Sequence, residues 1–224
     1  FEPVSMLVPP GQEDDARNHL GCGIELVPLE IDDSWARDSG PCFLSDGNSL
    51  RALCFTFNAW GGKYHPYDRD AEMGRGIAAA EGIEAVTSEL VAEGGGLSVD
   101  GEGTLLTTLS CFPNANRNPD WSQAAIEAEL KRALGVETVI WLPGNPYETE
   151  TNGHVDGIAM FAAPGVVIAE RPSGEPPEEA EFMRSTLAAL EGATDARGRR
   201  LKVIPLDSAS ECDSAGNPTY RRYI

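Results

Sequence analysis

Apolar runs that meet at short glycine-containing turns recur along the chain and predict three β-hairpins. The first spans residues 40–55 and turns at Asp-Gly-Asn, and the second spans residues 96–108 and turns at Asp-Gly-Glu-Gly. The third spans residues 154–170 and turns at Ala-Pro-Gly. Their similar spacing indicates that the chain is assembled from related units.

A helix-like stretch and then a strand-like stretch follow each hairpin. Apolar residues recur at helical spacing weakly over 70–81, and clearly over 119–135 and 177–192. In the clearest of these, 119–135, we expect an aspartate to start the helix and Gly135 to end it. Short apolar runs predict buried strands at 83–86, 137–143 and 201–206. Residues 1–30 resemble the helix-and-strand end of an earlier unit.

The repeat predicts the fold class and the domain organisation. The hairpins begin at residues 40, 96 and 154, so the spacing is 56 residues (40 to 96) and then 58 (96 to 154). We therefore expect an α/β fold in one domain over 1–224, with quasi-repeats of about 40–90, 96–143 and 154–206. Units of this size usually stack or close into a ring. Three and a half units are too few to close one, so we expect the fold to be incomplete.

The net charge and the composition limit the classes of molecule that the protein is expected to bind. Asp and Glu number 36 against 17 Lys and Arg, which gives a net charge of −19. Nucleic acids and anionic membranes need a basic face, so neither is an expected partner. The charge is compatible with a small cationic substrate, although solubility is the simpler explanation. No stretch approaches 18 apolar residues, so no membrane span is expected.

The number and spacing of the cysteines indicate in which cellular compartment the protein works. There are five, an odd number with no Cys-x-x-Cys spacing, and three stand in apolar runs. This pattern predicts buried free thiols in the reducing cytoplasm, with neither a disulfide framework nor a zinc site. The sequence begins at Phe1 without a methionine, which leaves room for a natural N-terminus further upstream.

Polar residues at the entries to the hairpins are the candidates for chemistry. They are Asp38 before the first hairpin, Glu93 before the second, and His154 and Asp156 at the start of the third. If the units are related by rotation, these residues converge on one pocket. Side chains two apart on a strand share a face, so we expect His154 and Asp156 to point the same way. The glycines at 94–96 would allow close backbone approach or positive φ.

Three carboxylates and one histidine suit a planar cation. A guanidinium stays charged at neutral pH and is matched by bidentate carboxylates. A histidine, whose pKa is ordinarily near neutrality, suits proton transfer. No cysteine or serine stands in a recognisable activated setting among these residues.

Each candidate also has a simpler interpretation. His154 and Asp156 could be a hydrogen-bonded structural pair, and Asp38 could form a local ion pair. Trp35 could belong to the core or line the pocket. His154 and Asp156 could also bind a metal together with Glu148 or Glu150, but one histidine makes a weak site.

Five stretches resemble, in the same order, signature blocks of the family that holds agmatine deiminases and bacterial peptidyl-arginine deiminases. They are DDSWARDSGP (32–41), FNAWGGKY (57–64), EGGGLSVDGEGTLLTT (93–108), CFPNANRNP (111–119) and TNGHVDGIAMF (151–161). The resemblance covers nearly the whole chain and thins after about Arg171.

The resemblance implies a fold and a reaction. The fold is a pentein of five ββαβ units around a central site, of which about three and a half are present here. The reaction converts agmatine to N-carbamoylputrescine and ammonia through a cysteine thiouronium, without metal or organic cofactor, in the biosynthesis of putrescine and other polyamines. By the resemblance, Asp38 and Asp156 hold the guanidinium, and His154 is the general acid and base. Glu93 holds the substrate or orients the histidine, and Trp35 lines the pocket.

One departure from the family affects activity. The family's nucleophile lies near the C-terminus in a Gly-Gly-x-Ile-His-Cys stretch, and this sequence ends at Ile224 before such a stretch. We therefore assign the nucleophile to none of the five cysteines and expect no turnover from the 224 residues alone. An open ring would expose apolar edges, through which a second copy could pair into a homo-oligomer.

Three alternatives stay open beside agmatine deiminase. The first is a deiminase of peptidyl arginine or of another guanidino compound. The second is a catalytically incomplete pentein fragment that binds guanidinium ligands. The third is a metallohydrolase that uses His154, Asp156 and Glu93.

Overall fold

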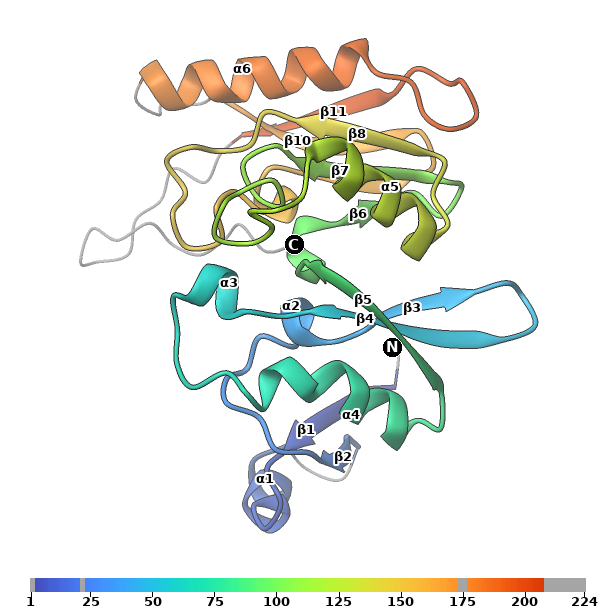
Figure 1. The fold of residues 1–224 in the computed structure, drawn as a ribbon, viewed down its shortest axis with the longest axis vertical. Coiled ribbons are helices and arrows are strands. Elements are labelled where there is room, and N and C mark those ends of the chain that lie inside the picture. Colours follow the sequence, from blue (N-terminus) through green and yellow to red (C-terminus); the bar gives the residue numbers. More distant parts are fainter. Residues whose placement is uncertain (1–2, 21–22, 173–176, 208–224) are drawn as a thin grey trace. The chain divides into compact units, whose positions relative to one another are not determined.

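The fold, in a computed structural model, is mixed α/β with several small sheets, as the pattern predicts (Figure 1). The structure describes residues 3–20, 23–172 and 177–207. Within these residues there are three three-stranded sheets and one two-stranded sheet. The chain forms two compact units, Phe1–Gly94 and Gly95–Ile224, and each is described by itself. No helix in the described part is long and apolar enough to cross a membrane.

The first unit contains a parallel pair and one three-stranded sheet. Its elements are β1 (Ser5–Val8), α1 (Glu13–Leu20), β2 (Glu25–Pro28), α2 (Ala36–Ser39), β3 (Cys42–Ser45), β4 (Leu50–Thr56), α3 (Ala59–Gly62), η1 (Asp70–Glu72), α4 (Met73–Ala80) and β5 (Glu84–Val91). β1 pairs with β2 in parallel. β4 pairs with β3 antiparallel and with β5 in parallel, and α4 makes the crossover that the parallel pair requires.

The second unit contains two sheets with the same pattern. Its elements are β6 (Ser98–Val99), β7 (Thr104–Thr108), α5 (Gln123–Leu134), β8 (Thr138–Leu142), η3 (Val155–Gly157), β9 (Ala159–Ala163), β10 (Val166–Arg171), α6 (Pro177–Gly192) and β11 (Lys202–Asp207). In each sheet the middle strand pairs antiparallel with the strand before it and parallel with the strand after it. The short helix η2 (Gly94–Gly96) stands where the first unit ends and the second begins.

Most elements agree with the predictions, with shifts at their ends. All three hairpins are present, but the third begins at Ala159 because the residues before it form η3. The helix predicted over 119–135 begins only at Gln123, and its cap is Ser122 rather than an aspartate. The Ser122 hydroxyl accepts from the amide of Ala125 at 3.2 Å. Gly135 ends this helix in the left-handed conformation, as predicted.

The core of the second unit joins both of its sheets to one face of α6 (Figure 1). β7 is buried along its whole length, and the buried face of α5 includes Ile126 and Leu130. The buried cluster consists of Leu106, Leu142, Val155, Ile158, Ala159, Val167, Ala169, Phe182, Met183, Leu190 and Leu201. Val155 is fully buried there, so the residue that follows His154 is anchored in the core.

The glycine-rich run is needed for close packing, not for positive φ. A Cβ on Gly96 would lie 2.4 Å from Cζ of Phe112, whose ring is fully buried. A Cβ on Gly94 would lie 2.1 Å from the carbonyl oxygen of Arg37. Neither glycine has a left-handed φ. Of the two reasons predicted for these glycines, close backbone approach is therefore the one that applies.

Gly96→Ala should destabilise the protein because the added methyl meets a ring that cannot move away. We expect the free energy of unfolding to fall by about 2 kcal/mol, as for overpacked cores. Urea unfolding measures it, with Gly192→Ala as the control because a Cβ there meets nothing within 4 Å. Equal stability of the two variants would contradict the tight packing at Gly96.

Candidate active site

Asp38 lies in the short helix α2, and its carboxylate is held by a tryptophan of the same unit. Asp38 is 9% exposed, and the indole Nε1 of Trp60 donates to its Oδ2 at 2.9 Å. Trp60 has φ 55° within α3, an unusual left-handed conformation for a large residue. The side chain of Asn58 caps this turn by accepting from the amide of Gly61 at 2.8 Å. The tight turn thus presents the indole to Asp38.

A buried aspartate holds the loop that leads into α2. Asp70 is 4% exposed and accepts from the backbone amides of Asp32 and Asp33. Burial raises the pKa of Asp70, although these two hydrogen bonds act in the opposite direction. Trp35, further along the loop, is 44% exposed, so it is not a core residue. Its carbonyl accepts from the amides of Asp38 and Ser39.

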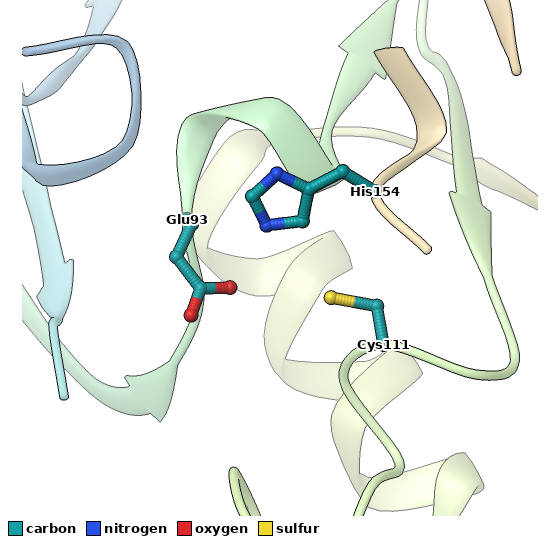
Figure 2. Close-up of side chains that lie close together, drawn as sticks. All are labelled: Glu93, Cys111 and His154. Atoms are coloured by element: carbon teal, nitrogen blue, oxygen red, sulfur yellow. The ribbon is translucent and has the colours of Figure 1, made fainter. Parts of the chain in front are cut away.

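Glu93, Cys111 and His154 form a compact buried group (Figure 2). Glu93 follows β5, Cys111 lies in the turn after β7, and His154 directly precedes η3. Glu93 and Cys111 have 0% exposure and His154 has 5%. A ligand-type atom from each residue lies within 4.8 Å of the other two. An acid, a thiol and an imidazole at this separation can exchange protons, directly or through a bound molecule.

The same three side chains are also of the types that bind zinc. A carboxylate, a thiolate and an imidazole could hold Zn²⁺ and leave one position open. The metal-binding set considered from the sequence joined His154 and Glu93 with Asp156 instead. The structure groups them with Cys111, and Asp156 is not part of the group.

The strand geometry expected for His154 and Asp156 is wrong. Residues 155–157 form the 3₁₀ helix η3, and β9 begins only at Ala159. His154 precedes η3 and Asp156 lies inside it, so the two residues do not share a strand face. His154 is buried and Asp156 is half-buried. The roles proposed for the two residues therefore need support other than strand periodicity.

Glu148 organises the loop that precedes His154, which we call the histidine loop (residues 145–154). Its carboxylate accepts from the backbone amides of Glu150, Thr151 and Gly153, the last at 2.7 Å. It also accepts from the Thr151 hydroxyl, whose oxygen in turn accepts from the amide of His154 at 3.0 Å. Two hydrogen bonds thus connect Glu148 to the backbone of His154.

These contacts set the protonation state of Glu148. Burial acts to raise its pKa, but the hydrogen bonds from Thr151, Gly153 and Glu150 outweigh burial, and the pKa lies below its ordinary value. The carboxylate already binds three backbone amides, which leaves Glu148 poorly suited as a metal ligand beside His154. Glu150, the other acid considered for that role, is exposed.

Three cysteines lie in the described residues, none of them in a disulfide there, and they differ in chemistry. Burial raises the pKa of Cys42 to about 11 and also raises that of Cys54, so both thiols are protonated at neutral pH. Cys111 is the one that lies in the group with His154 and Glu93. Cys22 and Cys212 lie outside the described residues.

An α/β fold with a buried acid, thiol and imidazole grouped together is typical of an enzyme active site. The whole chain, residues 1–224, matches the family described as Porphyromonas-type peptidyl-arginine deiminase. The chain belongs to this family, as the resemblance of its sequence blocks predicts.

Individual relatives are similar to this chain along nearly its whole length. Agmatine deiminase of Ectopseudomonas mendocina is 41% identical over 228 residues, which cover 96% of this chain and 62% of that protein. Agmatine deiminase of Pseudomonas aeruginosa (strain LESB58) is 41% identical over 229 residues, covering 95% and 62%. The structure of agmatine deiminase of Enterococcus faecalis matches with a TM-score of 0.89 at 37% identity, covering 94% and 60%. The chain thus spans about three fifths of the length of these relatives.

Four residues around His154 received no catalytic or positioning role from the sequence. They are Cys111, Arg117, Glu148 and Thr151. The first two lie in the block CFPNANRNP, which resembles the family, so the block signalled their importance without indicating a function. Glu148 entered only as a possible metal ligand, because a carboxylate that binds backbone amides has no sequence signature of its own.

Glu148→Gln should weaken the protein at neutral pH, because the amide replaces a charged acceptor of several hydrogen bonds. We expect a loss of about 2 kcal/mol in the free energy of unfolding at pH 7. The pKa of Glu148 is lower in the folded state than in the unfolded state. Its stabilisation is therefore present above the unfolded-state pKa and is lost as the pH falls through the folded-state value. The difference between variant and wild type should shrink below about pH 4.

Urea unfolding at several pH values measures this difference. The control is Glu181→Gln, which removes an exposed ion pair to Arg184 on α6 and should cost less than about 0.5 kcal/mol. A difference for Glu148→Gln that stays constant from pH 7 to pH 3 would contradict the assigned role of the charge.

Proposed function

We propose that the full-length protein is a guanidino-group deiminase that converts agmatine to N-carbamoylputrescine and ammonia. The observation that carries the proposal is the buried group of His154, Glu93 and Cys111 in a chain about 40% identical to proteins named agmatine deiminase. A small cationic substrate also suits a protein with a net charge of −19.

The proposed roles follow the chemistry of the guanidinium. Asp38 and Asp156 hold its nitrogens, and Trp35 lines the pocket. A thiolate attacks the guanidinium carbon, and the C–N bond breaks as His154 gives a proton to the departing ammonia. Water then attacks the thiouronium carbon and gives one of its protons to His154. As the thiolate leaves, the second proton of the water passes to solvent, and the ureido product remains. Glu93 holds the substrate or orients the imidazole.

Two sources of the thiolate are compatible with this chemistry. We propose a cysteine beyond residue 224, in a Gly-Gly-x-Ile-His-Cys stretch, and no turnover from the 224 residues alone. Cys111 is the second candidate because its Sγ lies in the group with His154. Cys42 and Cys54 are poor candidates because burial raises the pKa of both thiols.

Further features of the full-length protein belong to the same proposal. We propose a complete pentein of five units, a cytoplasmic location suited to free thiols, and pairing of two copies through exposed sheet edges. Peptidyl arginine or another guanidino compound is the alternative substrate. A guanidinium-binding protein without turnover is the alternative function.

A second candidate function is metal-assisted hydrolysis. It is favoured by one observation, the presence of three donor types suited to Zn²⁺ at Glu93, Cys111 and His154. Activity that persists with a strong chelator separates the two candidates.

Full-length protein should release ammonia and a ureido product from agmatine, and His154→Ala should lower this rate about 10³-fold. Asp156→Asn should also lower it, because a neutral amide no longer matches a guanidinium nitrogen. The control is His19→Ala, which changes an exposed histidine on α1. Ammonia release from agmatine and from arginyl peptides, with and without chelator, is the measurement. Full activity of His154→Ala would refute the site, and loss of activity with chelator would favour the metallohydrolase.

Cys111→Ser tests the source of the thiolate. If the nucleophile lies beyond residue 224, the variant should keep activity of the same order as wild type, since a serine fills nearly the same space. Acid-quenched turnover followed by peptide mass spectrometry should then find the covalent adduct on another cysteine. An adduct on the peptide that contains Cys111, together with an inactive variant, would make Cys111 the nucleophile.

A further inference from the structure

Side chains from one segment, residues 108–117, donate hydrogen bonds to the backbone carbonyls of the three residues before His154. The pairs are Thr108 Oγ1 to Gly153 O at 2.7 Å, Ser110 Oγ to Asn152 O at 2.7 Å and Arg117 Nη2 to Thr151 O at 2.8 Å. All of these residues lie in the second unit. The segment therefore holds the carbonyl side of the histidine loop, while Glu148 holds its amide side.

Arg117 donates to the histidine loop from both of its terminal nitrogens. It is 3% exposed, and its Nη1 donates at 2.8 Å to Oδ1 of Asn152 and to Oδ1 of Asn116. With Nη2 on the Thr151 carbonyl, the guanidinium bridges two consecutive residues of the histidine loop. Burying a cation is costly, so a guanidinium that donates several well-formed hydrogen bonds at this position indicates a specific role.

The residue that Arg117 holds has an unfavourable backbone. Asn152 has φ 65°, and Gly153 after it has φ 81°. A non-glycine residue in the left-handed region usually persists because surrounding contacts enforce it. The side chain of Asn152 also accepts from Nδ2 of Asn116 at 3.0 Å. Gly153 tolerates no side chain, since a Cβ there would lie 2.6 Å from Oγ of Ser110.

We propose that Arg117 is a positioning residue for His154. Its guanidinium fork holds Thr151 and Asn152 in the left-handed turn that delivers the imidazole to Glu93 and Cys111. The inference rests on the proposed function of His154 as general acid and base. Arg117 itself touches no substrate in this scheme, so its loss lowers the rate of the chemical step and leaves substrate binding nearly unchanged.

The test compares Arg117→Met and Arg117→Lys in the full-length enzyme. Met fills similar space without hydrogen bonds, and a misplaced catalytic group should lower kcat about 100-fold, with KM within about twofold. Lys keeps the charge but lacks the planar fork whose two nitrogens reach the two acceptors, so an intermediate kcat is expected. The control is Arg132→Met, which removes an exposed ion pair to Glu129 on α5 and should leave kcat unchanged.

Asn152→Asp provides a rescue that a purely structural role would not produce. A carboxylate at this position still accepts from Arg117, and it pairs more strongly than an amide with a lysine at 117. Arg117→Lys combined with Asn152→Asp should therefore recover part of the lost kcat, so that the two changes are not additive. The unfolding midpoint of each variant separates loss of activity from loss of folded protein.

Hydrogen exchange tests whether Arg117 positions the histidine loop, and it does so without a measurement of activity. Peptides that cover residues 150–154 should exchange faster in Arg117→Met than in wild type, while β7 stays protected. Unchanged exchange, or a kcat within about twofold of wild type, would overturn the positioning role. If wild type does not turn over guanidino substrates, the proposed function fails, and the exchange result alone decides whether Arg117 positions the loop.

Discussion

The backbone of residues 151–153, which leads to His154, lies in neither a helix nor a strand, and these residues are half-buried or buried. Its peptide groups need partners, because an unpaired buried amide or carbonyl costs as much as a lost hydrogen bond. Side chains supply them: Glu148 accepts from amides, and residues 108–117 donate to carbonyls. The place of the imidazole thus depends on side-chain to backbone hydrogen bonds rather than on regular secondary structure.

The first unit uses the same device around Asp38. Asp70 accepts from two consecutive backbone amides of the loop before α2, and Asn58 caps the turn that carries Trp60. Hydrogen bonds between side chains and backbone thus hold both loops that bear proposed catalytic residues. Such loops can hold conformations that helices and strands forbid, including the positive φ of Trp60 and Asn152.

The sequence predicts the scaffold better than the site. Hairpins and helices follow from local periodicity, so the three hairpins and the helices α5 and α6 were predicted to within a few residues. The 3₁₀ helix at 155–157 was missed, because a polar cluster before an apolar run resembles the start of a strand. The nearness of Cys111 to His154 has no local signal either. It depends on contacts between residues about 40 positions apart, which periodicity does not record.

Those long separations have a consequence for the order of folding. The hydrogen bonds from Thr108, Ser110 and Arg117 to the histidine loop span 45, 42 and 34 residues. Closing a loop of this length lowers the entropy of the chain before any stabilising contact has formed. A hairpin joins residues that are close in sequence, so the entropy lost in forming it is smaller. The strands β6 and β7 can therefore pair while the histidine loop is still unformed. A nascent chain would thus gain local secondary structure before His154, the proposed proton-transfer group, is held in place.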